Sequence, residues 1–343
     1  MSMRSPGFMH HARVAVGRAP QAALALALAL GCATDGADDP EDETDGSSGA
    51  ASSSGGESGG SGEASTAAST GEGEDGSSSG GESLPQPTML PTPTGVCPTL
   101  AAGDVELAPA GIAPRTVRLW MSDAAATMPG PLVFYWHGTG SQPLEAEYGL
   151  GNALIEQVVA QGGIVVAPTH DPAAGDFPWF LVLGNQEDDL LVADELLGCA
   201  LEQTMVDVRR VHTIGMSAGG LQSAQMSFRR SGYIASAVTY SGGLVAGAPP
   251  DQDPDNPMSA MIFHGGESDV VLISFQQASE SYLGALQAKG GFGFLCNHGM
   301  GHSIPQGDAQ PSVWTFFYDH PFGTTPSPYV DGLPPGFPSY CTL

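Results

Sequence analysis

The chain has 343 residues and a net charge of −27 at neutral pH, with 10 Lys and Arg residues against 37 Asp and Glu residues. The first 95 residues carry 13 acidic residues and the remainder carries 24, so both parts are acidic. A nucleic-acid-binding protein needs clustered basic residues that displace counterions from phosphates, and none are clustered here. The composition therefore excludes that class.

The first 31 residues have the pattern of an export signal. Three arginines precede an apolar run, residues 22–30, that is too short to span ~30 Å of hydrocarbon. The run ends in Ala-Leu-Gly-Cys, which resembles a bacterial lipobox, although Ala29 stands where leucine is favoured. We expect a signal peptide over residues 1–31, followed either by lipidation of Cys32 or by ordinary secretion.

Residues 33–95 are rich in Gly, Ser, Ala, Thr, Asp and Glu and contain no aromatic residue, Lys or Arg. Such a segment lacks the apolar surface needed to offset the chain entropy lost on folding. We expect a flexible linker over residues 32–95 and one folded domain over residues 96–343. With lipid on Cys32 the domain would be held at a bacterial cell envelope, and this anchor would be its only contact with a membrane.

Four further cysteines, Cys97, Cys199, Cys296 and Cys341, lie in the expected domain. Four cysteines in an exported domain predict two disulfides, with three possible pairings that the sequence leaves open. A bridge between Cys97 and Cys341 would tie down both ends of the domain. No two of the cysteines are close in sequence and only Cys296 has histidines nearby, so we expect no metal site.

The domain alternates between apolar runs and helix-like segments, which indicates a doubly wound, mostly parallel sheet. Two short runs separated by prolines and glycine, 105–107 and 116–121, predict antiparallel N-terminal edge strands. The later expected strands are 131–136, 164–167, 211–214, 234–240, 260–264 and 292–296, and the expected helices are 153–160, 188–201, 220–228, 275–288 and one beginning at 313.

The motif Gly215-Met216-Ser217-Ala218-Gly219 follows one of these runs and precedes a helix. In a nucleophile elbow, a sharp strand-to-helix turn lifts a serine hydroxyl clear of the backbone. The turn strains the serine and brings strand and helix close together, so the positions two before and two after it must be small. Both are glycine, and we therefore expect Ser217 to be a catalytic nucleophile.

Possible partners of Ser217 follow it along the chain. Asp269 lies just past strand 260–264, and His302 lies in a glycine-rich loop after the last expected strand. The glycines should let this loop fold back toward Ser217, where His302 would act as base while Asp269 orients it. His298 remains an alternative base and Glu267 an alternative acid.

An oxyanion needs two backbone N–H donors, and the amide of Ala218, directly after the nucleophile, is the first. We expect Thr139 to supply the second, because its loop follows a buried strand at the edge where α/β sheets bind ligands. Trp179 and Phe180 follow the next strand. They could line an aromatic or acyl pocket, or they could plug the site as part of a hydrophobic lid.

Together these motifs resemble the esterase family that contains feruloyl esterases, acetylxylan esterases and extracellular polyhydroxybutyrate depolymerases. The resemblance covers about residues 115–323 and rests on Trp136 to Gly140, Val208 to Gly220, His264-Gly265 with Asp269, and Gly299 to Pro305. It implies an α/β-hydrolase fold, the triad Ser217, Asp269 and His302, and no cofactor.

The resemblance implies an ester substrate of the feruloyl, acetyl-polysaccharide or hydroxyalkanoate type, which could be linked to a polysaccharide or polymer. We expect the protein to be a monomer. The alternative hypothesis is a catalytically idle hydrolase fold that serves as a tethered surface binding module.

Overall fold

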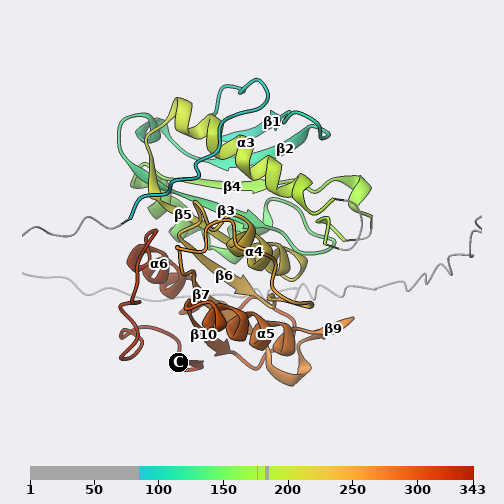
Figure 1. Ribbon diagram of the computed structural model, residues 1–343, viewed down its shortest axis with the longest axis vertical. Helices are drawn as coiled ribbons and strands as arrows, with labels where there is room; N and C mark the ends of the chain where they lie inside the picture. The colour runs from blue at the N-terminus through green and yellow to red at the C-terminus, as the bar shows by residue number, and fades with distance from the viewer. Residues whose placement is uncertain (1–84, 176, 182–184) are drawn as a thin grey trace, which may run out of the picture. The chain divides into compact units, whose positions relative to one another are not determined.

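The computed structural model describes residues 85–175, 177–181 and 185–343, and the expected signal peptide, Cys32 and most of the expected linker lie outside these ranges. The described residues form a nine-stranded sheet with helices on both faces (Figure 1). Within these ranges, no helix is both long enough and apolar enough to cross a bilayer.

The sheet has the order β1-β2-β4-β3-β5-β6-β7-β10-β11. Its parallel part consists of β3 (Gly130–Trp136), β4 (Ile164–Pro168), β5 (Val206–Met216), β6 (Ser236–Tyr240), β7 (Ser259–His264) and β10 (Phe292–Asn297). Antiparallel strands form both edges: β1 (Gly103–Leu107) and β2 (Arg115–Trp120) at one, and β11 (Cys341–Thr342) at the other. The predicted parallel sheet with antiparallel N-terminal edge strands is confirmed. Strand β11 was not predicted, since two residues carry no periodic pattern.

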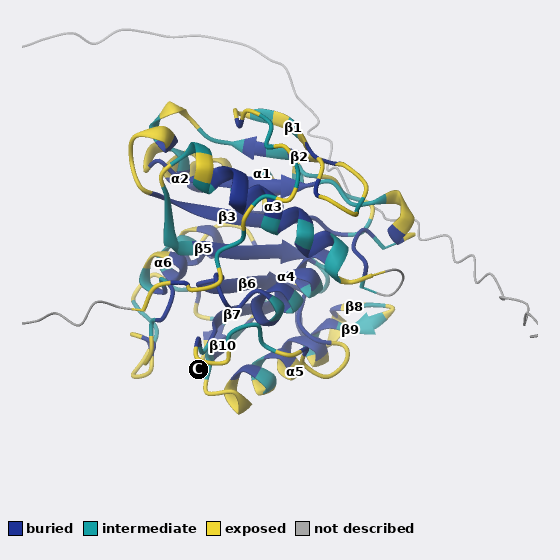
Figure 2. Ribbon diagram, turned by 45° about the horizontal axis from the view of Figure 1, so that its top comes forward, coloured by how far each residue is buried: buried dark blue, intermediate teal, exposed yellow. Residues whose placement is uncertain are grey.

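Two hydrophobic cores lie on the two faces of the sheet. The first is covered by α3 (Glu187–Gln203), α4 (Ala218–Arg229) and α5 (Phe275–Ala288), and the second by α1 (Glu145–Gly149), α2 (Asn152–Ala160) and α6 (Ala309–Asp319). Along β3, Phe134 and Trp136 pack into the first core, whereas Val133 and Tyr135 pack into the second. The central strands are therefore buried on both faces (Figure 2), which explains their continuous apolar runs.

The packed domain begins before residue 96, so the expected linker boundary at residue 95 is wrong. The buried carboxylate of Glu195 on α3 accepts hydrogen bonds from Thr94 N–H at 2.7 Å and Gly95 N–H at 2.8 Å, and Leu90 packs against the first core. Apolar side chains of this stretch also pack on the domain, since a Cβ on Gly198 of α3 would lie 2.8 Å from Pro93 Cδ. These contacts and the hydrogen bonds to Glu195 hold the stretch against a helix distant in sequence.

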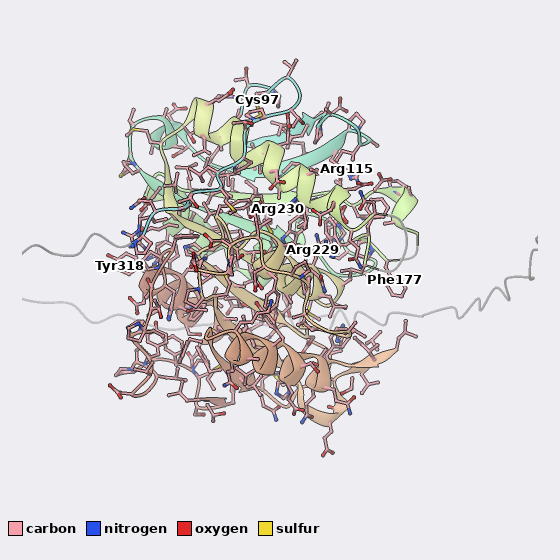
Figure 3. All side chains as sticks on the ribbon, in the orientation of Figure 1. Cys97, Arg115, Phe177, Arg229, Arg230 and Tyr318 are labelled. Carbon is pink, nitrogen blue, oxygen red and sulfur yellow. A yellow bond between two sulfur atoms is a disulfide. The ribbon has the colours of Figure 1, made fainter. Side chains whose placement is uncertain are left out.

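Disulfides join Cys97 to Cys199 and Cys296 to Cys341. A bridge from Cys97 to Cys341, the pairing that would have tied the two ends together, is excluded because these residues lie at opposite edges of the sheet. Cys97 instead lies against α3 near the β1 edge (Figure 3), and the second bridge fastens β11 to β10.

Basic side chains join α4 to α3 across the first face of the sheet (Figure 3). Arg230 contacts Asp194 at 2.8 Å and Glu187 at 3.0 Å, and Arg229 also pairs with Glu187. Tyr233 donates a hydrogen bond to Asp194 at 2.7 Å. Because α4 begins at the expected nucleophile, these contacts hold the helix on which the site depends.

Two glycine-to-alanine substitutions should have opposite effects on stability. A Cβ on Gly219 would lie 1.8 Å from the carbonyl oxygen of Trp136, whereas one on Gly284, exposed on α5, would meet nothing within 4 Å. We expect Gly219→Ala to destabilise the fold by about 3 kcal/mol or more through overpacking. Gly284→Ala should stabilise it by about 0.5–1 kcal/mol, because alanine favours the helix. Urea unfolding measures both, and equal midpoints for the two variants would contradict the close packing at Gly219.

Candidate active site

Ser217 lies between the end of β5 and the start of α4, with φ of 56° and ψ of −119°. Its N–H donates to the carbonyl of Tyr240 at 2.9 Å, which holds the turn against β6. A Cβ on Gly215 would lie 2.4 Å from the carbonyl oxygen of Gly219, so side chains at these positions would force the turn open. The strained serine and the flanking glycines have the geometry that the sequence motif predicts.

His302 contacts both Ser217 and Asp269. Its Nε2 is 2.9 Å from Ser217 Oγ, and its Nδ1 is 2.7 Å from Asp269 Oδ1. Since a carboxylate only accepts, Nδ1–H donates to Asp269, and in the neutral ring Nε2 is then the acceptor for the serine hydroxyl. This is the arrangement in which an imidazole can take a proton from a serine.

Two glycines allow the loops that carry Asp269 and His302 to meet. Gly301 N–H donates to the carbonyl of Gly265 at 3.1 Å, and a Cβ on Gly265 would lie 1.8 Å from the carbonyl oxygen of Gly301. Gly301 also has a φ of +69°, which other residues rarely adopt. The ring of Phe275 packs on the His302 ring at 4.5 Å between centroids, which limits its rotation.

Asp269 has no solvent-accessible surface. Its Oδ2 accepts hydrogen bonds from Ser241 Oγ–H at 2.8 Å and from Gly265 N–H at 2.9 Å. Burial alone would raise the pKa of Asp269, but the hydrogen bonds from His302, Gly265 and Ser241 outweigh it and hold the pKa below its ordinary value. The role of Ser241 was not predicted from the sequence, because no local pattern identifies a serine after a strand as the hydrogen-bond partner of an acid 28 residues later.

The alternative base and acid are placed differently. His298 is half-buried, and its Nδ1 accepts a hydrogen bond from Met300 N–H at 3.2 Å. Glu267 is exposed to solvent. Among the described residues, neither side chain hydrogen-bonds Ser217 or His302.

The loop after β3 packs directly against the expected nucleophile. A Cβ on Gly138 would lie 3.4 Å from Ser217 Cβ. Thr139 follows in this loop, and Ala218 is the first residue of α4, where the helix dipole favours negative charge. Within the described part of the chain, neither Thr139 N–H nor Ala218 N–H donates a hydrogen bond, so both can serve an incoming oxygen.

A chain of two histidines supports this loop from inside the protein. His137 Nδ1–H donates to the carbonyl of Gly138 at 2.9 Å, and Ser141 N–H donates to the same oxygen at 3.1 Å. His170 Nδ1–H then donates to His137 Nε2 at 3.3 Å. Burial lowers the pKa of His137 to about 4, so the ring is neutral near pH 7 and can both donate and accept.

Trp179 and Phe180 are both buried, which argues against the first of the two alternatives, the lining of an open pocket. Trp179 is 1% exposed, its indole N–H donates to the carbonyl of His137 at 2.9 Å, and its ring packs edge-on against Trp136. Phe180 is 5% exposed, and its N–H donates to Asp189 at 2.7 Å. The Trp179 side chain therefore packs behind the loop after β3, and the Phe180 side chain is buried beside Arg115.

Exposed apolar side chains lie on the same loops as the expected triad and oxyanion donors. A short hairpin, β8 (Val270–Val271) with β9 (Ile273–Ser274), begins directly after Asp269. The exposed members of this group, which we call the apolar rim, are Leu144, Tyr148, Val270, Leu272 and Met300, each between 41% and 63% exposed. The rim was not predicted, because surface exposure of single apolar residues follows from the packing of the loops around them.

A cavity of about 260 Å³ lies elsewhere, between residues 89–94 and α3, with Asp194, Glu195 and Tyr233 in its wall. It contains none of the expected catalytic residues. In the described part of the chain, no three His, Cys, Asp or Glu side chains are grouped as metal ligands would be.

No protein-family model and no curated protein sequence matches the chain. Among solved structures, it is similar to native pOPH, with a TM-score of 0.59 and 17% identity over 72% of this chain and 96% of that one. It is also similar to native sOPH, with a TM-score of 0.55 and 16% identity over 73% of this chain and 96% of that one. A thermostable esterase is a weaker likeness, with a TM-score of 0.48 and 18% identity over 64% of this chain and 62% of that one.

These structural likenesses and the strand order show that the chain has the α/β-hydrolase fold, as the sequence predicts. Structures named as a thermostable esterase and a ferulic acid esterase are also among its neighbours. Because the sequence identities are only 16–17%, the structural likeness to pOPH and sOPH establishes the fold alone. The chemistry depends on the residues of the site.

The hydrogen bond from Ser241 to Asp269 should make a pH-dependent contribution to stability. A carboxylate whose folded pKa lies below its ordinary value of 3.8 stabilises the fold above that value, and the contribution is lost as pH falls. We expect Ser241→Ala to cost about 1–2 kcal/mol at pH 7 and progressively less below about pH 4. Ser279, which donates to the carbonyl of Gly242 at 3.2 Å, is the control, because the cost of Ser279→Ala should not vary with pH. Urea unfolding from pH 7 to pH 3 tests this, and a cost of Ser241→Ala that is constant with pH would contradict it.

Proposed function

We propose that the protein is a serine hydrolase of carboxylic esters. The observation that carries the proposal is the continuous hydrogen-bonded chain from Ser217 through His302 to the buried carboxylate of Asp269. Two unengaged N–H groups, those of Thr139 and Ala218, lie on segments next to the serine. A nucleophile, its base, an orienting acid and oxyanion donors are together the requirements for acyl transfer.

In the first half-reaction, Ser217 Oγ attacks the ester carbonyl carbon while its proton moves to His302 Nε2. The carbonyl oxygen becomes an oxyanion that accepts hydrogen bonds from Thr139 and Ala218, each worth about 3 kcal/mol in the transition state. Asp269 stabilises the imidazolium that has formed. The bond to the alkoxy group then breaks, and the alcohol leaves with the proton from His302.

In the second half-reaction, water replaces the alcohol. His302 takes a proton from the water as its oxygen attacks the acyl-enzyme, and the same two N–H groups stabilise the second oxyanion. The bond to Ser217 Oγ breaks, His302 returns the proton to the serine, and the carboxylic acid is released. All atoms and charges balance without a cofactor.

The apolar rim favours esters that carry an apolar group near the scissile bond. Its five side chains present hydrocarbon to solvent on segments close in sequence to Thr139, Asp269 and His302, and burying such surface contributes about 25 cal/mol per Å². Feruloyl and hydroxyalkanoate esters offer more apolar surface than an acetyl group on a polysaccharide. We therefore place the first two classes ahead of the third.

The expected location of the protein is a bacterial cell envelope or the medium. Two disulfides are typical of an oxidising compartment. We propose that Cys32 carries a lipid anchor, a proposal that rests on the sequence motif because this residue lies outside the described ranges.

Replacing the nucleophile tests the function directly. Wild-type protein should hydrolyse p-nitrophenyl butyrate and be labelled by a serine-directed phosphonate, whereas Ser217→Ala should lose both properties. We expect turnover to fall by about 10⁴-fold or more, as when a triad member is removed. Turnover by Ser217→Ala at the wild-type rate would refute the assignment. A ligand that binds both proteins equally, with no turnover by either, would favour a binding module.

Single substitutions of the two histidines in the loop after β10 test which of them is the base. His302→Ala should lower kcat by about 10³-fold or more, because the serine loses its proton acceptor. His298→Ala should change kcat by less than about tenfold, since among the described residues its ring hydrogen-bonds Met300 N–H and packs near Tyr340 but bonds neither Ser217 nor Asp269. Circular dichroism checks that both variants are folded. The reverse order of effects would show that His298 is the base.

A further inference from the structure

A carboxyl group outside the expected triad, that of Glu145 at the start of α1, lies beside the loop after β3. We call this loop, residues 137–140, the oxyanion loop because it contains the expected donor Thr139. Oε1 of Glu145 accepts hydrogen bonds from Gly138 N–H at 3.0 Å and from the hydroxyl of Tyr135 at 3.1 Å. A Cβ added to Gly138 would lie 3.5 Å from Glu145 Oε2 and 3.4 Å from Ser217 Cβ. The carboxyl group and the expected nucleophile therefore both lie next to one glycine, and the triad does not account for Glu145.

The position of this carboxyl group is set by the sheet beneath it. Tyr135 is fully buried on β3, and its hydroxyl reaches Glu145 past Gly149, where a Cβ would lie 2.2 Å from the hydroxyl oxygen. Tyr240 on β6 donates to the carbonyl of Gly149 at 3.1 Å, which fixes the other end of α1. A short helix held at both ends carries Glu145 in a defined place.

The hydrogen bonds of the two peptide groups that flank Gly138 indicate the role of Glu145. The carbonyl of His137 accepts from Trp179, the N–H of Gly138 donates to Glu145, and the carbonyl of Gly138 accepts from the His137 ring. The fourth polar group of these two peptides is the N–H of Thr139. In a trans peptide it points opposite to the carbonyl of Gly138, and it is therefore directed away from the His137 ring.

We propose that Glu145 is a positioning residue that holds the oxyanion loop, and that its charge makes the site select against esters whose acyl group carries a carboxylate. The proposal rests on the esterase function proposed above. The hydrogen bond to a carboxylate is stronger than one to a neutral acceptor, so it resists movement of the loop during acyl transfer. A second negative charge near Ser217 would be repelled across a short distance in a partly buried site.

The positioning role is tested by Glu145→Ala and Glu145→Gln. The glutamine amide oxygen can still accept from Gly138 and Tyr135, so Glu145→Gln should keep kcat for p-nitrophenyl butyrate within about threefold of wild type. Glu145→Ala should lose about 10- to 100-fold in kcat with KM within about twofold, because the loop acts in the transition state. Glu147 on the same helix, whose carboxylate accepts from Trp120, is the matched control, and Glu147→Ala should match wild type.

The effect of the Glu145 charge on selectivity is tested at pH 8 with two substrates. These are p-nitrophenyl butyrate, which is neutral, and the p-nitrophenyl hemiester of succinic acid, whose acyl group carries a carboxylate. Relative to the neutral ester, Glu145→Gln should raise kcat/KM for the anionic ester about tenfold, whereas Glu147→Gln should not. An unchanged ratio in Glu145→Gln would overturn the charge role. Wild-type kcat in Glu145→Ala would overturn the positioning role.

Three further measurements distinguish these outcomes from misfolding of a variant and from failure of the esterase proposal. Tyr135→Phe, which preserves the packed ring, should lower kcat about two- to fivefold, and thermal unfolding of each variant reports its folding. The rate of phosphonate labelling at Ser217 reports on the oxyanion site without turnover, and it should fall in Glu145→Ala. If wild type is neither labelled nor active, the esterase proposal fails together with this one. If wild type is active and labelled while Glu145→Ala is equal to it, only the role of Glu145 fails.

Discussion

The close approach of three backbone segments at Ser217 is the constraint on which the site depends. Strand β5 turns into α4 within one residue, and Gly219 then lies against the carbonyl of Trp136 with no room for a side chain. The turn strains Ser217, and the burial of β5 and α4 in the cores offsets that strain. Because helix α4 starts here, its first N–H and the loop after β3 both lie beside the serine.

A second close approach assembles the acid and the base from separate loops. Gly265 and Gly301 are in backbone contact, so the loop after β7 and the loop after β10 behave as one unit. Asp269 is thereby buried among N–H and O–H donors, where charge–charge interactions are less screened than in water. The same contact places His302 between the carboxylate and Ser217, so the arrangement of the loops decides the electrostatics of the site.

Much of the fold and the central motif could be predicted because they depend on local patterns. Apolar runs marked the buried strands, and the spacing of glycines around Ser217 marked the turn. Other features depend on contacts between distant segments. Trp179 is an aromatic residue in a loop near the site whether it faces solvent or packs behind His137, and no pattern distinguishes the two. Ser241 and Glu145 likewise gain their roles only from partners on other segments. The disulfide pairing follows from where the folded chain places the cysteines.

The anchoring of the N-terminal segment determines how the domain would respond to mechanical force. A pull from the N-terminal side meets the hydrogen bonds of Thr94 and Gly95 to Glu195 first and then the Cys97–Cys199 disulfide, and both pass the load into α3. Strand β1, which begins at Gly103 on the sheet edge, is shielded from that load and would not be peeled from β2. If the domain is tethered as proposed and its substrate is a large insoluble body, the bridge lets the attachment bear shear while the ends of the central strands β5 and β7, which precede Ser217 and Asp269, stay unstrained.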